Sequence, residues 1–224
     1  MTTCVISQPR FFPGMHYLSR MQVADWFVIF DNVQFTPRHE ENRCKVKGPQ
    51  GAQWLTAGVK KGPREQLVMD TRISYEQPWH QDALKTLAHL YGKSPFYERY
   101  IGEVKAILEA GHETLTGLDR ASWEPALRLL SPKCKFVLAS ELPCQGKGPP
   151  LLLDICKHLG AGTYLSGGFG REYLDLAPFT SAGVEVVFHD YQNPVYPQRH
   201  GEFVPYLSYL DMLFQVELEP ARVA

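Results

Sequence analysis

The sequence lacks a strong excess of charge of either sign and any long hydrophobic run. Its 224 residues carry a formal net charge of −1, so no global attraction to nucleic acid or to a membrane is expected, and only a local basic patch could supply one. The longest apolar runs are about five residues, far short of the roughly 20 that cross a bilayer. The N-terminus lacks a basic segment followed by an apolar one, so we expect no secretion signal and no membrane partner.

Cysteine pairs and metal-ligand spacings are also absent. The five cysteines are scattered, without a C-x-x-C pair, which favours reduced thiols in a cytoplasmic protein over a disulfide framework or a zinc site. The histidines show no metal spacing, and we assign no metal ligands. The sequence leaves the metal requirement, any cofactor and the oligomeric state open.

The first 35 residues predict a strand, a helix and a second strand. The apolar run Cys4–Ile6 ends in Gln8-Pro9, a helical segment ends near Asp25, and the apolar run Trp26–Phe30 ends in a polar segment that begins with Asp31. Two buried strands joined through a helix form a βαβ unit, which requires a parallel sheet. Ligands of such sheets bind beyond the carboxyl ends of the strands, where both polar segments fall.

The middle of the chain changes from strand to helix periodicity. Basic and apolar residues alternate over 43–47, and a turn at 48–51 leads to a second strand over 53–59, which predicts a β-hairpin with one basic face. A further short strand is expected over 65–74. From residue 79 to about 130, apolar residues recur at three- and four-residue spacing and predict three helices, which we interpret as an insertion.

Strand and helix patterns alternate again after residue 135. Strands are expected at 136–139, 163–165 and 184–188, with a helix over 151–159, a helical turn within 172–179, and a helix-like segment over 206–214. The alternation at both ends of the chain predicts a single α/β domain. This domain should have an open, mostly parallel sheet with flanking helices, the hairpin, and a helical insertion at about 79–130.

The polar segments at the first two strand ends carry the candidate catalytic residues, Gln8, His16 and Asp31. The loop that ends at His16 resembles in layout the strand–loop–Gly-x-His segment that contacts phosphates in nucleotidylyltransferases. The second histidine that is usual there is absent, because Tyr17 and Leu18 follow His16. The alternative is an ordinary βα loop. Asp31 could orient or deprotonate an amine or bind a metal with water, with Gln34 contacting substrate. Alternatively, Asp31 could cap a turn or helix. Because adjacent strand ends meet, we expect Asp31 beside Gln8.

The hairpin region holds the strongest anion-binding candidates. Arginine grips a phosphate with two parallel bonds, and lysine adds a point charge. The alternative is a solvated edge strand, where lysines block aggregation, and we expect this alternative for Lys47. Substrate contact is expected from Arg38, Asn42, Arg43 and Lys45.

Two glycine-containing turns and the tail supply the remaining candidates. Lys147 lies in a G-K-G segment before a helix, where backbone amides attract phosphate, although the segment is not a Walker loop. Ser166 and Gly167 begin a glycine-rich turn where a ligand can approach the backbone. Each could equally be a tight turn. In the tail the candidates are Tyr196, Gln198 and Asp211. Core packing is the alternative reading for the tail.

The chain also carries a series of short motifs in a fixed order. They are QPRFFPG at 8–14, ADWFVIFDNVQF at 24–35, NR at 42–43 with QWLT at 53–56, GKG at 146–148, YLSG at 164–167, YLD at 173–175, YPQ at 196–198 and LSYLDMLF at 207–214. Over nearly its whole length the chain therefore resembles the WbqC-like family of bacterial and phage proteins.

The resemblance implies a group-transfer function. Family members look like proteins encoded in gene neighbourhoods for O-antigen biosynthesis, where a group-transfer role is inferred. Phage relatives imply a role beside DNA-base hypermodification, in which an amino acid is installed on an activated thymidine. We expect a transferase that joins an amine-bearing small molecule, such as an amino acid, to a phosphate-bearing acceptor, either a nucleotide sugar or modified DNA. The alternative is a non-catalytic nucleotide- or nucleic-acid-binding module. The enzyme hypothesis requires the candidate residues to converge on one cleft.

Overall fold

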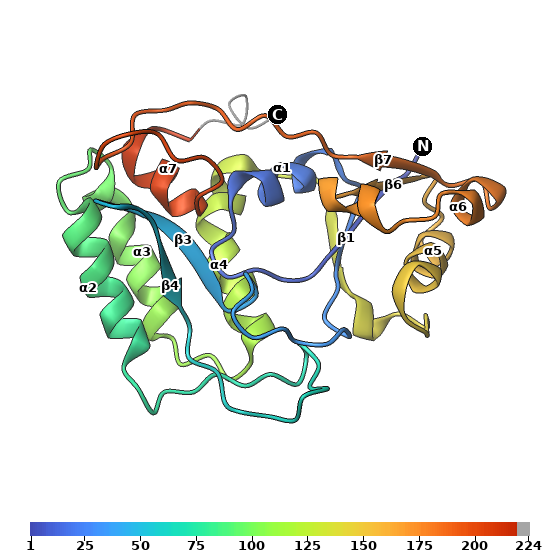
Figure 1. Cartoon of the computed structure of the whole chain (residues 1–224), viewed down its shortest axis with the longest axis horizontal. Coiled ribbons are helices and arrows are strands. Elements are labelled where there is room, and N and C mark those ends of the chain that lie inside the picture. The colour runs from blue at the N-terminus through green and yellow to red at the C-terminus, as the bar shows by residue number, and fades with distance from the viewer. Residues whose placement is uncertain (219–224) are drawn as a thin grey trace. The chain divides into compact units, whose positions relative to one another are not determined.

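The computed structural model describes residues 1–218, which group into two units (Figure 1). Unit 1 contains residues 1–8, 19–33 and 132–192. Among the described residues, unit 2 contains 9–18, 34–131 and 193–218. The expectation of a single domain stays a prediction.

Unit 1 is built on a five-stranded sheet. Its strands are β1 (Thr3–Ser7), β2 (Trp26–Ile29), β5 (Lys135–Leu138), β6 (Thr163–Ser166) and β7 (Glu185–Phe188). They lie in the order β5-β2-β1-β6-β7, and every neighbouring pair is parallel. The register places Ser7 opposite Ile29, so the carboxyl ends of β1 and β2 lie at the same edge. The predicted parallel sheet is confirmed.

Helices pack on this sheet because its strands are apolar. The helices are α1 (Met15–Val23), whose last turns belong to unit 1, α5 (Gly148–His158) and α6 (Ala177–Ser181), with short 3-10 helices η1 (Ala139–Glu141) and η2 (Gly168–Glu172). Alternate residues of a strand share a face, so Cys4 and Ile6 lie on the same face of β1. They belong to one buried cluster with Ile155 of α5 and Phe179 of α6. The predicted flanking helices are therefore present.

Unit 2 combines a hairpin with four helices. The antiparallel hairpin consists of β3 (Arg43–Gly48) and β4 (Gly51–Thr56), and the helices are α2 (Trp79–Tyr91), α3 (Tyr97–Glu109), α4 (Leu115–Leu130) and α7 (Tyr209–Gln215). Helix α3 packs on α2, α4 and α7. The Thr114 side chain begins α4 by accepting a 3.1 Å hydrogen bond from the Gly117 amide. The expected hairpin and helices are found.

The segment 65–74 corrects one expectation, because it forms no strand. Its pairing is limited to isolated bridges, which join Leu67 to Gln34, Ile73 to Val59 and Arg72 to Thr114. The backbone instead curls through tight turns, and the Gln66 amide holds them by donating to the Thr71 hydroxyl at 3.0 Å. Residues 60–72 line an open hollow of about 570 Å³ that contains none of the predicted site residues. Side-chain hydrogen bonding within the segment thus replaces strand pairing.

The helices and the cysteines bear on two expectations from the sequence. None of the helices within residues 1–218 is long and apolar enough to span a bilayer. All five cysteines lie in this described part, and each is buried with a free thiol.

Candidate functional site

The strand order of unit 1 defines a topological switch point between β1 and β6. From β1 the chain proceeds outward to β2 and β5 on one side, and later to β6 and β7 on the other. Connections on the two sides of β1 therefore leave in opposite directions. In open parallel sheets such a point, at the carboxyl ends of the strands, is where ligands bind.

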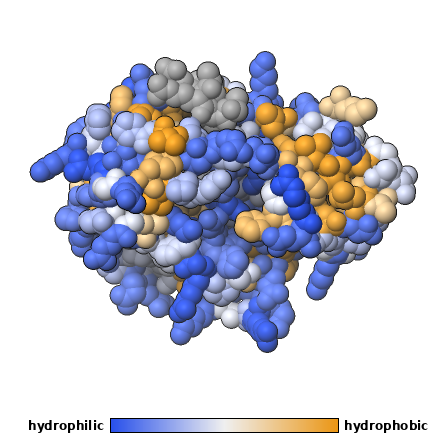
Figure 2. Space-filling view, turned by 45° about the horizontal axis from the view of Figure 1, so that its top comes forward, coloured by the Kyte–Doolittle hydropathy of each residue, from blue (hydrophilic) through white to orange (hydrophobic). Residues whose placement is uncertain are grey.

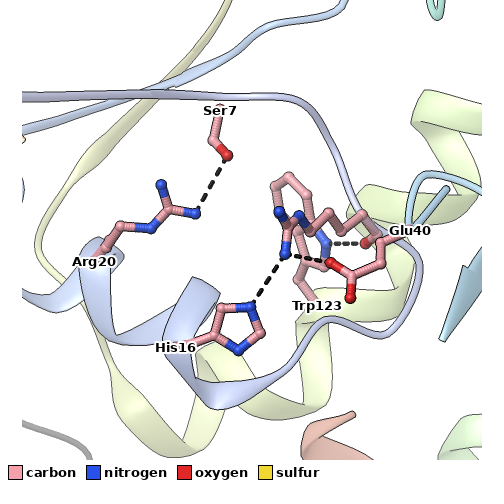
Figure 3. Close-up of polar contacts among 6 residues, drawn as sticks. Ser7, His16, Arg20, Glu40 and Trp123 are labelled. Atoms are coloured by element: carbon pink, nitrogen blue, oxygen red, sulfur yellow. Dashed lines mark hydrogen bonds and ion pairs between the residues drawn. The ribbon is translucent and has the colours of Figure 1, made fainter. Parts of the chain in front are cut away.

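Arg20 lies at this switch point. It comes from the last turn of α1, is 5% exposed, and its Nη2 donates to the Oγ of Ser7 at 3.3 Å. Figure 3 shows the guanidinium extending from the helix toward that hydroxyl. A Cβ on Gly167 would lie 3.5 Å from Nη1, so the guanidinium also packs against the backbone that follows β6. The switch point thus carries a fixed positive charge with planar donor geometry, which suits an anion.

One side-chain and one backbone hydrogen bond hold the glycine-rich turn after β6. Ser166 is buried and its hydroxyl donates to the Gly167 carbonyl at 3.2 Å. The Gly170 amide closes the turn on the Gly167 carbonyl at 2.9 Å. Gly168 and Phe169 are exposed, with 80% of Phe169 accessible. The turn therefore presents a backbone segment and an aromatic ring to solvent.

Alanine at position 170 is expected to distort this turn. Its Cβ would collide with the Ser166 hydroxyl and lie only 3.0 Å from the Phe188 ring. Overpacking of this kind costs about 1–3 kcal/mol. Urea unfolding should show the loss, with Gly183→Asn as the control because that glycine has a positive φ and open space around it. An unchanged midpoint for Gly170→Ala would contradict the tight packing of the turn.

His189 adds a titratable group to the same edge. It follows β7, and its amide donates to the Ser166 carbonyl at 2.9 Å. Its Nε2 lies 3.5 Å from the Ser19 hydroxyl, and its ring stacks on Tyr191. Burial, followed by the charge of Arg20, lowers the pKa of His189, although Asp190 acts in the opposite direction. The imidazole is therefore neutral at pH 7 and able to accept a proton.

The surface next to this edge is partly apolar. Figure 2 shows hydrophobic surface gathered over the end of the molecule where α6 and β7 lie. Phe169, Leu176 and Val187 are among the exposed apolar side chains of unit 1. A substrate that carries a ring as well as an anionic group could use both surfaces.

The predicted residues of unit 1 differ in their environment. Gln8 follows β1 at the carboxyl edge, and Asp31 follows β2 beside it. Asp31 is 2% exposed, and its two oxygens accept from the backbone amide and the hydroxyl of Ser140, at 2.9 and 2.7 Å. This arrangement favours the capping role that the sequence left open. Lys147 is exposed and precedes α5 without a side-chain cap.

His16, in unit 2, makes a specific contact with Arg10. The Nη1 of Arg10 lies 3.1 Å from the Nε2 of His16, and the same guanidinium forms an ion pair with Glu40 (Figure 3). Arginine can only donate, so in this contact Nε2 is the acceptor. The indole of Trp123 donates to the Arg10 carbonyl at 2.8 Å and fixes the segment. A catalytic role for His16 stays a prediction, and it would have to release this contact.

The hairpin presents two cations on an aromatic surface. The guanidinium of Arg43 lies 3.8 Å from the centroid of the Trp54 ring, and the Nζ of Lys45 lies 5.0 Å from it. Within residues 1–218 neither cation forms an ion pair. Asn42 instead donates to the Ala57 carbonyl at 3.0 Å and joins the hairpin base. Arg43 and Lys45 therefore keep the charge needed for anion binding.

Lys47 corrects the expectation of a solvated lysine. It is 2% exposed, and its Nζ donates to the carbonyl of Glu202. The tail covers this end of the hairpin face, so the ammonium is removed from water although the strand alternation is as predicted. Arg38 and Gln34 are exposed, and Gln34 donates to the Arg64 carbonyl at 2.8 Å.

The three tail candidates form one hydrogen-bonded network around a buried carboxyl group. The hydroxyls of Tyr91 and Tyr196 donate to the two oxygens of Asp211 at 2.6 and 2.7 Å. Gln198 donates to the Tyr196 hydroxyl at 3.1 Å. Asp211 is fully buried, and burial raises the pKa of its carboxyl despite these hydrogen bonds. The structure thus brings the three predicted residues together, in an arrangement that favours the core-packing alternative.

Sequence reasoning missed Ser7, Arg20 and His189, whereas the residues that it selected are divided between the units. Gln8, Asp31, Lys147, Ser166 and Gly167 belong to unit 1, and the other candidates to unit 2. Convergence of the two sets on one cleft stays a prediction. No group of three or more His, Cys, Asp or Glu side chains in the described chain could hold a metal ion.

The fold and this edge define an open α/β protein with a candidate anion site at its switch point. The sequence model of the WbqC-like protein family matches residues 8–223, and the chain belongs to that family. It is 30% identical over 230 residues to the uncharacterized protein Rv1507c of Mycobacterium tuberculosis, with 98% of this chain and 96% of that protein covered. No solved structure matches the chain.

Proposed function

We propose that the protein is a group transferase that joins an amine-bearing small molecule, such as an amino acid, to a phosphate-activated acceptor. The observation that carries the proposal is the contact of Arg20 with Ser7, against Gly167, at the switch point. A buried guanidinium there provides a place for the phosphate of the acceptor. The glycine turn supplies backbone that a phosphate can approach closely.

The chemistry needs a base and a stabilised leaving group. In the proposed step a C–N bond forms between the amine and the acceptor carbon, and the C–O bond to phosphate breaks. The phosphate leaves with its electron pair, and Arg20 stabilises the charge. The neutral imidazole of His189 accepts the proton that the amine loses. Positioning of two substrates supplies the rest of the rate enhancement.

Two biological settings are compatible with this chemistry. The acceptor is a nucleotide sugar in O-antigen biosynthesis, or a phosphorylated thymidine derivative in phage DNA, where the protein would be an amino acid:DNA transferase. The net charge of −1 favours the small acceptor, while Arg43 and Lys45 on Trp54 offer a basic and aromatic surface for a DNA strand. Five free thiols agree with a cytoplasmic location.

A labelling experiment tests the proposal. The protein is incubated with radiolabelled amino acids and either nucleotide sugars or phosphomethyl-uracil DNA, and label in one acceptor identifies the setting. His189→Gln should lower the transfer rate by about 10²–10⁴-fold, the usual contribution of a general base, and leave phosphate binding unchanged. His158→Gln is the control, because that histidine is exposed at the end of α5.

The binding-module alternative predicts a different result. Retention of nucleotide or DNA that weakens with salt, without label transfer to any acceptor, would refute the transferase and support that module. Transfer at an unchanged rate in His189→Gln would remove His189 from the mechanism but keep the transferase.

A further inference from the structure

Unit 2 contains a buried carboxyl group without a hydrogen-bond partner. Asp119, in the first half of α4, is fully buried, and within residues 1–218 neither of its oxygens has a partner. Buried polar groups are almost always hydrogen-bonded, and a buried carboxylate without a partner is among the costliest groups in a protein. The position therefore calls for a ligand or a proton that the chain itself does not supply.

A second buried carboxyl group lies near it. Glu41 is 4% exposed, and its Oε2 also lacks a partner in the described chain. Burial raises the pKa of both carboxyls, and the charge of Glu41 raises that of Asp119 further. A hydrogen bond from its own backbone amide and the charges of His39 and Arg10 act to lower the pKa of Glu41. The charge of Glu40 acts to raise it.

Backbone hydrogen bonds hold the two segments against a common strip of chain. The amide of Phe11 donates to the Glu40 carbonyl at 3.0 Å. The next amide, that of Phe12, donates to the Ser122 hydroxyl at 2.9 Å, and that hydroxyl donates to the Asp119 carbonyl at 2.7 Å. Two consecutive residues, Phe11 and Phe12, therefore connect the loop beside Glu41 to this turn of α4.

Two neutral side chains on the same two segments also have an unsatisfied oxygen. Thr116 lies one turn before Asp119 on α4, is 8% exposed, and has no partner for its hydroxyl. Asn42 follows Glu41, is 6% exposed, and has no partner for its Oδ1 because only its Nδ2 is bonded, to Ala57. Four buried side chains from two short segments thus leave oxygens unsatisfied.

We propose that Glu41 and Asp119 bind a divalent hard cation, Mg²⁺ or Ca²⁺, with Asn42 and Thr116 supplying neutral oxygens. Such cations take carboxylate, amide and hydroxyl oxygens as ligands. Two carboxylates balance two positive charges, whereas a shared proton or a monovalent cation leaves one buried negative charge. The site uses only two acidic residues, and it does not depend on the proposed transferase activity.

Metal analysis and refolding test the site. The full-length protein is purified, and its Mg and Ca content is measured. It is then unfolded in urea in the presence of EDTA, which removes any bound metal, and refolded with or without each cation. We expect bound metal near one per chain and a thermal midpoint that rises with cation concentration. Tb³⁺ should give luminescence on excitation of Trp123, which lies one turn after Asp119 on α4.

Matched variants decide between the cation and a proton. Asp119→Asn and Glu41→Gln should each lose the cation-dependent midpoint shift and the Tb³⁺ signal, whereas Asp70→Asn, at an exposed carboxylate, should keep both. The proposal is overturned if wild-type protein refolds identically with and without Mg²⁺ and Ca²⁺. A higher midpoint for Asp119→Asn at pH 7 would then indicate that a proton, and not a cation, neutralises the site. The proposal is equally overturned if the cation effect survives in Asp119→Asn.

Discussion

Replacing Arg20 by methionine is expected to weaken the binding of inorganic pyrophosphate by about 10- to 100-fold, because hydrogen bonds to charged groups contribute about 1.5–3 kcal/mol. The guanidinium is held between the Ser7 hydroxyl and Gly167 at the switch point of the sheet. Titration calorimetry of the full-length protein measures the change. Salt should weaken wild-type binding and affect the variant less.

Three further variants show whether the weaker pyrophosphate binding of Arg20→Met is specific to the guanidinium. Arg20→Lys retains a charge but loses the planar fork, so it should bind at an intermediate strength. Ser7→Ala removes one contact of the guanidinium and should weaken binding less than Arg20→Met. Arg171→Met, at an exposed arginine of η2, serves as a control for general charge. Equal pyrophosphate affinity in wild type and folded Arg20→Met would remove the anion site from the switch point.

Arg20 also explains why the site was only partly predictable from the sequence. The strand ends were predictable, since apolar runs followed by polar residues mark β1, β2 and β6. An arginine in the last turn of a helix is read as favourable to the helix dipole and solvated. Only the packing of α1 places this one against β1 and the turn after β6. A signal was present in its position, because the first helix of such a sheet follows the strand at the switch point.

Lys47 and Asp31 show the same limit from the other direction. Alternation put Lys47 on the basic face correctly, but a tail segment more than 140 residues away in sequence removes it from water. Asp31 was expected beside Gln8, and its strand end is adjacent to that of Gln8. However, β5 also borders β2, and Ser140 after it occupies both oxygens of Asp31. Local patterns predict elements and edges, whereas the partner of a polar group depends on tertiary packing.

Replacing Asp211 by alanine is expected to cost about 2–5 kcal/mol of unfolding free energy, because it leaves a cavity and removes the acceptor of two hydrogen bonds. Asp211 is fully buried, and its loss would leave the hydroxyls of Tyr91 and Tyr196 without their acceptor. The Tyr91 hydroxyl also accepts from the Lys47 amide at 2.7 Å, so the damage would extend to β3. Urea unfolding at constant pH measures the change in midpoint.

The pH dependence of this cost has a defined sign. Burial raises the pKa of Asp211 above its unfolded value, so the folded protein binds the proton more tightly than the unfolded chain does. The contribution of Asp211 to stability is therefore complete below about pH 4, near the unfolded pKa, and declines as pH rises through the folded pKa. The difference between wild type and Asp211→Ala should be larger at pH 4 than at pH 7.

Tyr196→Phe separates the network from simple loss of volume, since it keeps the ring and removes one hydroxyl. It should cost about 1 kcal/mol, and the double variant with Asp211→Ala should lose less than the sum of the single changes, because both remove the same hydrogen bond. Strict additivity would show that the two side chains are not coupled, and a cost for Asp211→Ala that grows from pH 4 to pH 7 would show that Asp211 is ionised and stabilising in the fold. That outcome would return it to the candidate substrate-binding residues.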